Sequence, residues 1–105
     1  MTMFKKLTPR EAYAAYILGS LIVDVRDHSA GDSKNLDVRQ VVALPLSELD
    51  QRLNELPSNR PVVLLSNIGI RGKEAARMLV ERGYQDVSIV TGGIKAWEQE
   101  GLPVK

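Results

Sequence analysis

Residues 62–72 read Val-Val-Leu-Leu-Ser-Asn-Ile-Gly-Ile-Arg-Gly, and this stretch decides the fold. Its first four residues form a short, continuous apolar run, which is typical of a strand buried on both faces of a parallel sheet. The glycines that follow predict a turn, and the apolar spacing from residue 72 to about 82 predicts a helix. Strand, turn and helix in this order make the repeating unit of an α/β protein.

The same unit recurs on both sides of this stretch. Apolar runs predict strands at residues 21–25, 41–44 and 87–90, and helical patterns cover residues 9 to about 18, 47 to about 56 and 93–99. Such alternation implies right-handed crossovers, so we expect an α/β fold with a mainly parallel sheet and helices on both faces.

Several helix ends carry recognisable signals. Thr8 and Glu11 predict a capping box, and Gly19 is the expected terminator of that helix. Ser47 and Asp50 predict a second capping box. Trp97 is expected to anchor the core rather than to bind a ligand.

Length and composition limit the classes of protein. A chain of 105 residues, 44% hydrophobic and 26% charged, predicts one globular domain over residues 1–105. The 14 basic and 13 acidic residues are interspersed, which argues against a nucleic-acid surface. Residues 1–6 lack the apolar stretch of a signal peptide, and no run approaches membrane-spanning length, so a cytoplasmic protein without membrane association is expected.

The chain contains no cysteine and a single histidine, His28. Disulfides, thiolate nucleophiles and cysteine-based metal sites are thereby excluded, and no metal or other cofactor is expected. Residues 28–40 are polar and predict a long loop, and long loops in compact domains are often functional.

The turn at residues 66–72 is the candidate site, because ligands of parallel α/β sheets bind outside the carboxyl ends of the strands. Its amides and the following helix N-terminus predict an anion-binding loop. Arg71 and Lys73 stand where the helix dipole disfavours cations, which costs little if an anion binds there. Alternatively, both side chains simply point into water, with Glu74 offsetting their charge. The predicted loop residues are Asn67, Ile68, Gly69, Ile70 and Gly72.

This turn resembles the active-site loop of the rhodanese family of sulfurtransferases. Ser66 occupies the family's cysteine position, and Ile68 and Ile70 before Arg71 are similar to rhodanese domains fused to coenzyme A disulfide reductases. Residues 21–27, with their Asp-Val-Arg, and residues 91–97 and 101–104 resemble further family signatures. Residues 28–40 lack the Gly-His-Ile-Pro-Gly-Ala-like stretch that the family usually has.

The resemblance implies a rhodanese-like α/β fold with a five-stranded parallel sheet and helices on both faces. It also implies sulfur transfer through a cysteine persulfide, with thiosulfate, a persulfide or another thiol as partner. That chemistry needs a thiolate, which Ser66 cannot supply. The resemblance therefore implies a sulfurtransferase-type domain that is inactive as written, with Ser66 as the former nucleophile position and Arg71 as the source of charge. Asp24 and Arg26 are expected to shape the rim of the site by pairing, either for ligand contact or for structure alone.

Three interpretations stay open from the sequence. The chain is a catalytically silent rhodanese domain that binds an anion or a protein partner, an active sulfurtransferase whose one cysteine was replaced, or a protein with different chemistry. One such chemistry is a Ser66–His28 hydrolase dyad, although no Gly-x-Ser-x-Gly motif is present.

Overall fold

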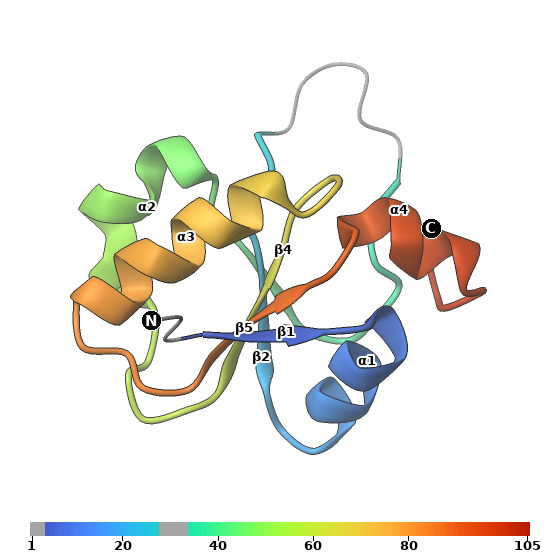
Figure 1. Ribbon diagram of the computed structural model, residues 1–105, viewed down its shortest axis with the longest axis horizontal. Coiled ribbons are helices and arrows are strands. Elements are labelled where there is room, and N and C mark those ends of the chain that lie inside the picture. Colours follow the sequence, from blue (N-terminus) through green and yellow to red (C-terminus); the bar gives the residue numbers. More distant parts are fainter. Residues whose placement is uncertain (1–3, 28–33) are drawn as a thin grey trace.

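The computed structural model describes residues 4–27 and 34–105. Strands and helices alternate along the chain as the sequence predicts (Figure 1). In order they are β1 (Lys5–Leu7), α1 (Pro9–Ile17), β2 (Leu21–Asp24), β3 (Val41–Ala43), α2 (Leu46–Arg52), the 3₁₀ turn η1 (Leu53–Glu55), β4 (Val62–Leu65), α3 (Ile70–Glu81), β5 (Val87–Val90) and α4 (Gly93–Gln99).

The strands form one parallel sheet of five strands in the order β1-β5-β4-β2-β3. Helices α2 and α3 cover one face, and α1 and α4 cover the other (Figure 1). The predicted fold class is therefore confirmed. The carboxyl ends of β2, β4 and β5 all lie at the same edge of this sheet, because neighbouring strands run in the same direction.

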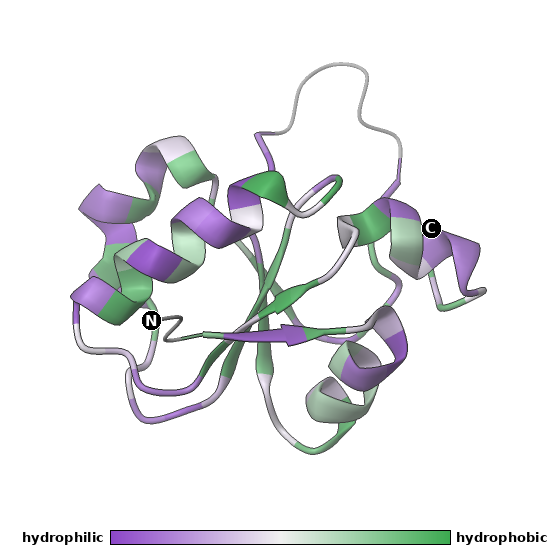
Figure 2. Ribbon diagram, viewed as in Figure 1, coloured by the Kyte–Doolittle hydropathy of each residue, from purple (hydrophilic) through white to green (hydrophobic). Residues whose placement is uncertain are grey.

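Strand β4 shows why the central strands lack polar alternation. Val62 and Leu64 pack into the core under α2 and α3, whereas Val63 and Leu65 pack into the core under α1 and α4. Both sides of the strand are thus removed from water, and all four residues of β4 are apolar, whereas β2 and β5 each contain one buried polar residue, Asp24 and Ser88 (Figure 2).

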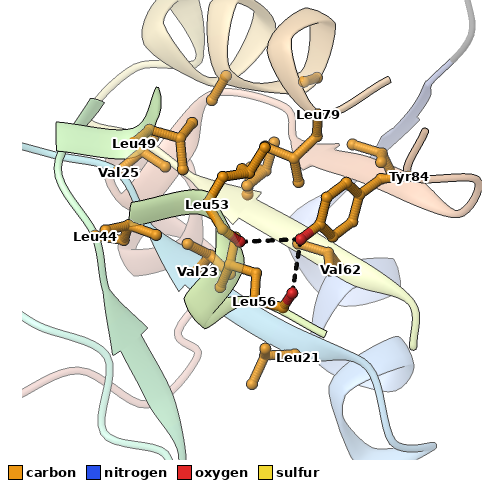
Figure 3. Close-up of a cluster of buried hydrophobic side chains, with 14 of the residues drawn as sticks. Leu21, Val23, Val25, Leu44, Leu49, Leu53, Leu56, Val62, Leu79 and Tyr84 are labelled. Carbon is orange, nitrogen blue, oxygen red and sulfur yellow. Dashed lines mark hydrogen bonds between the residues drawn. The ribbon is translucent and has the colours of Figure 1, made fainter. Parts of the chain in front are cut away.

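The core under α2 and α3 contains one polar anchor (Figure 3). The hydroxyl group of Tyr84 lies 2.6 Å from the carbonyl oxygen of Leu56 and 3.1 Å from that of Leu53. Burial raises the pKa of Tyr84 above its ordinary value, because the phenolate form is poorly solvated there. The phenol therefore ties η1 to the segment between α3 and β5.

The core under α1 and α4 is built around Trp97, which is fully buried. Its indole Nε1 donates to the carbonyl oxygen of Pro103 at 3.0 Å, and its ring meets that of Tyr13 edge-on, with the centroids 5.6 Å apart. Trp97 is thus the core anchor that the sequence predicts, and its one polar atom is satisfied.

The N-terminal helix begins and ends as predicted. Thr8 and Glu11 form a complete capping box, and Gly19 follows the helix with a φ of +113°. The second predicted capping box is wrong. Helix α2 begins at Leu46, where the amide donates to the carbonyl oxygen of Val25 at 3.0 Å, so the main chain satisfies the helix start without a Ser47 cap.

Strand β1 is the element that the sequence patterns missed. It has only three residues, two of them exposed lysines, and it pairs only with β5 at the edge of the sheet. An edge strand with this composition has neither an apolar run nor alternation to signal it. The strands predicted at residues 21–25 and 41–44 each end one residue earlier than expected.

Among the described residues the longest helix has 12 residues, and none combines the length and apolar character needed to cross a bilayer.

Candidate functional site

The loop between β4 and α3 is closed by a hydrogen bond from its own serine. Ser66 is only 1% exposed, and its Oγ accepts from the amide of Gly69 at 2.8 Å. Gly69 has a φ of +102°, a conformation open to glycine but strained for other residues. This tight closure starts α3 at Ile70, so the predicted turn over residues 66–72 is corrected to residues 66–69, with Arg71 and Gly72 in the first helical turn.

The N-terminus of α4 supports the loop from behind. The amide of Ile94 donates to the carbonyl oxygen of Ser66 at 2.8 Å, and the amide of Lys95 donates to that of Asn67 at 3.3 Å. Gly93 allows this close approach, because a Cβ at that position would lie 2.3 Å from the Ser66 carbonyl oxygen. The sequence predicted a helix over residues 93–99 and a family signature over residues 91–97, but it did not predict this contact with the loop. The Gly92-Gly93 pair at the start of the helix is a local signal that could have indicated it.

Several amides of the loop have no partner within the described parts of the chain. These are the amides of Asn67, Ile68, Ile70 and Arg71, of which the last two belong to the first turn of α3. Unpaired amides at a helix N-terminus carry partial positive charge and can donate to an anion.

A pocket of about 290 Å³ lies at the loop. The structure brings most of the predicted site residues to it; they are Ser66, Asn67, Ile68, Ile70 and Arg71. Gly72 lies at the base, where an added Cβ would sit 3.4 Å from Ser66 Oγ. The lining of the pocket is therefore mainly apolar, with Ile68 and Ile70 contributing aliphatic side chains, and the nearly buried Ser66 contributes to it from beneath the loop.

The guanidinium group of Arg71 is paired with a carboxylate that follows the end of the neighbouring strand β2. Arg71 forms an ion pair with Asp27, whose carboxylate also accepts from the Ser47 hydroxyl at 3.3 Å. Both partners of the pair are about half exposed. Asp27 thus competes with any anion for Arg71. No local sequence pattern indicates this ion pair, because its two residues lie far apart in the chain.

Asp24 and Arg26 form the pair that the sequence predicts, and the pair is buried. Arg26 Nε and Nη2 donate to the two Asp24 carboxylate oxygens at 2.9 and 2.8 Å, and the side chains are 2% and 5% exposed. Arg26 also donates to the Lys34 carbonyl oxygen at 2.8 Å and to the Asn35 side chain at 3.1 Å. Through these hydrogen bonds the pair holds the chain after residue 33 against the end of β2. Neither Asp24 nor Arg26 is among the residues that line the pocket beside Ser66.

His28 lies outside the described residues, so the Ser66–His28 dyad stays a prediction. Among residues 4–27 and 34–105, no group of three acidic or histidine side chains is placed to hold a metal ion.

These features define a class of protein: a parallel α/β domain with an amide-rich loop at the carboxyl end of its central strand. A family model described as "Rhodanese-like domain" matches residues 8–100. The chain belongs to the rhodanese-like domain family, and it contains no cysteine.

Relatives agree with this assignment. The chain is 33% identical to thiosulfate sulfurtransferase GlpE of Pseudomonas syringae over 97 residues, which cover 92% of this chain and 90% of the relative. It is 32% identical to a sulfurtransferase of Allochromatium vinosum over 84 residues, covering 80% of this chain and 77% of the relative. The chain thus resembles sulfurtransferases over most of its length although it contains no cysteine.

Solved structures share the fold. The Bacillus anthracis CoADR-RHD structure superposes with a TM-score of 0.81 at 30% identity, covering 90% of this chain and 16% of that one. A rhodanese-related protein from Thermoplasma volcanium superposes with a TM-score of 0.84 at 24% identity, covering 97% of this chain and 98% of that one. The first similarity agrees with the expected likeness of the loop to rhodanese domains fused to coenzyme A disulfide reductases.

Proposed function

We propose that this chain is a rhodanese-like domain that does not transfer sulfur and instead holds a small sulfur-containing anion, such as thiosulfate, without a covalent bond. The observation that carries this proposal is Ser66. It stands buried at the base of an amide-rich loop, and its Oγ accepts from Gly69.

The hydroxyl group explains the loss of catalysis. A cysteine at a helix N-terminus ionises readily, because nearby amides and the helix dipole stabilise the thiolate. Serine keeps its proton unless a general base removes it, and an alkoxide oxygen cannot carry a persulfide. Sulfur transfer therefore has no starting point in this chain.

The same substitution favours binding of an external anion. In a cysteine enzyme the loop would stabilise a negative charge that belongs to the protein itself. With a neutral hydroxyl group there, the amides of Asn67, Ile68 and Ile70 remain available to an anion from solution. Arg71 is close enough to help, since it lines the same pocket.

Titration of the ¹⁵N-labelled protein with thiosulfate or sulfate tests the proposal. We expect the largest amide shifts at residues 66–72, together with saturation. Arg71→Ala should weaken binding about fivefold, and Asp27→Asn should strengthen it, because it frees the Arg71 guanidinium group. Arg77→Ala is the matched control, since this arginine lies exposed farther along α3 and does not line the pocket.

The proposal fails if the shifts at residues 69–72 are the same in Arg71→Ala as in the unaltered chain. It also fails if Arg77→Ala weakens binding as much as Arg71→Ala does.

A further inference from the structure

Two aliphatic side chains protrude beside the pocket. Ile68 is 57% exposed and Ile70 is 63% exposed. Only four large hydrophobic side chains of the described residues are exposed, and the other two, Ile17 and Leu18, lie at the end of α1. Two of these four side chains thus lie at one loop, where Figure 2 shows short hydrophobic stretches at the tip of the loop and at the start of α3 beside hydrophilic ones. Clustered apolar residues on a surface mark interaction sites.

Basic residues outnumber acidic ones around this apolar pair: Arg71, Lys73 and Lys95 stand against Glu74 and Asp27, and Asp27 is already paired with Arg71. Helices α1 and α2 carry Glu11 and Glu48 in their first turns, as the helix dipole favours. The first turns of α3 and α4, which meet at the loop, contain no acidic residue. Lysines stand near their starts instead, at Lys73 and Lys95.

Both lysines are exposed, and neither forms an ion pair within the part of the chain that the structure describes. Lys73 is three residues after Ile70 on the same helix, so the two side chains share a face. Lys95 follows the α4 amide that supports the loop, and its own amide contacts Asn67. Unpaired cations therefore flank the apolar pair on two helices.

We propose that this face docks an acidic segment of a partner protein. An aliphatic side chain of the partner packs against Ile68 and Ile70, and its carboxylates face Lys73 and Lys95. The proposal rests on the proposed function in one respect, because a partner carboxylate would use the same loop amides as the small anion.

The chemistry of the surface selects this partner over others. A basic segment would meet like charges at Lys73, Lys95 and Arg71. A bare inorganic anion makes no use of the two isoleucines. Single-stranded nucleic acid is held largely by stacking on aromatic side chains, and none of the described residues that line this pocket is aromatic.

Three synthetic peptides test the proposal by ¹⁵N chemical-shift mapping: Glu-Glu-Leu-Leu-Glu-Glu, the same peptide with serine for leucine, and the same peptide with lysine for glutamate. We expect the first to shift amides at residues 66–73 and 93–96, and to bind more weakly as salt is added. The serine peptide should bind about fivefold more weakly, and the lysine peptide should produce no shifts there.

Substitutions on the protein complete the test. Ile68→Ser and Ile70→Ser together should weaken binding of the first peptide about tenfold. Leu18→Ser, at an aliphatic residue that is even more exposed and lies far from the loop in sequence, is the control and should leave peptide binding unchanged. Folding of each variant is checked from its amide spectrum.

The outcomes separate the two proposals. Thiosulfate binding without peptide binding at millimolar peptide overturns the docking surface and leaves the proposed function standing. Peptide binding without thiosulfate binding overturns the proposed function alone. Equal binding of all three peptides, or equal loss in Leu18→Ser, overturns the docking surface.

Discussion

At the scale of single residues, the proposed function depends on position 66, where a serine hydroxyl group stands and sulfur transfer would need a thiol. The side chain of Ser66 is buried beside Gly72 and is held by the Gly69 amide. A thiol is only slightly larger than a hydroxyl group, so the site should accommodate it. The electrostatic setting for a thiolate is already present at the start of α3.

The first prediction concerns Ser66→Cys. The unaltered protein should show no thiosulfate-to-cyanide sulfur transfer above background. The variant should form a persulfide, seen by mass spectrometry as one added sulfur atom after treatment with thiosulfate, because the loop amides and Arg71 lower the pKa of a thiol there. Measurable turnover should accompany the adduct.

A folded Ser66→Cys variant without an adduct would show that more than the nucleophile has changed. Sulfur transfer by the unaltered protein would contradict the proposed function directly. Ser66→Ala is the control, because it should neither form an adduct nor turn over.

The second prediction concerns Tyr84, whose hydroxyl group donates to the Leu53 and Leu56 carbonyl oxygens. Tyr84→Phe should lower the free energy of unfolding by about 1–2 kcal/mol at neutral pH, because it leaves buried acceptors without their donor. Urea unfolding measures the loss.

The pH dependence of that loss follows from the raised pKa of Tyr84. Below the ordinary tyrosine pKa of about 10, the phenol is neutral in both states and its stabilisation is complete. Above about pH 10, Tyr84 ionises more readily in the unfolded chain than in the folded protein. The difference in the free energy of unfolding between the unaltered protein and Tyr84→Phe should therefore shrink as the pH rises towards and through the folded-state pKa. A difference that stays constant to pH 11, about one unit above the ordinary value, would contradict this account.

At the scale of elements, the site is a contact between two helix starts and one strand end. Strand β4 delivers Ser66, α3 supplies amides, and α4 holds the loop carbonyls through Ile94 and Lys95. Gly93 is the position that lets α4 approach.

The third prediction compares two glycines with similar backbone conformations. Gly93 has a φ of +63° and Gly101 a φ of +75°. Gly101→Ala should cost only the conformational penalty, about 1 kcal/mol, because no atom lies within 4 Å of the added Cβ. Gly93→Ala should cost about 2–4 kcal/mol more, because its Cβ would overlap the Ser66 carbonyl oxygen.

Urea unfolding of both variants gives the two costs, and amide spectra show where the structure changes. Shifts at residues 66–69 are expected for Gly93→Ala alone. Equal destabilisation by the two substitutions would mean that α4 does not brace the loop.

At the scale of the whole molecule, the sheet order places β5, β4 and β2 between two neighbours and leaves β1 and β3 at the edges. The central strands are buried on both faces, whereas β1 and β3 are partly exposed. Stability should therefore fall from the centre of the sheet towards its edges (Figure 1).

The fourth prediction is a gradient of native-state hydrogen exchange. Amides in β4, and next to it in β2 and β5, should exchange only through global unfolding. Paired amides in β1 and β3 should exchange through local openings that need less free energy than global unfolding does. Equal protection of Leu7 in β1 and Leu64 in β4 would show that the edge strands open only with the whole domain.

The sequence by itself determined the features whose cause is local. Four strands were visible because burial on both faces requires continuous apolar runs, as at Val62–Leu65. The capping box of Thr8 and Glu11 was visible because its partners are three residues apart. The site loop was visible because its glycines and its position after a buried strand are local signals, and the resemblance to rhodaneses rests on this loop together with residues 21–27, 91–97 and 101–104.

Only the tertiary structure decided the contacts between distant segments. The Arg71–Asp27 ion pair joins residues 44 positions apart, and it follows from β2 and β4 being neighbours in the sheet. Leu46 starts α2 early because its amide meets Val25, and Gly93 matters because α4 meets Ser66. Apolar periodicity reports which side of an element is buried and carries no information about which element covers it; that depends on strand order, which the chain sets only when it folds.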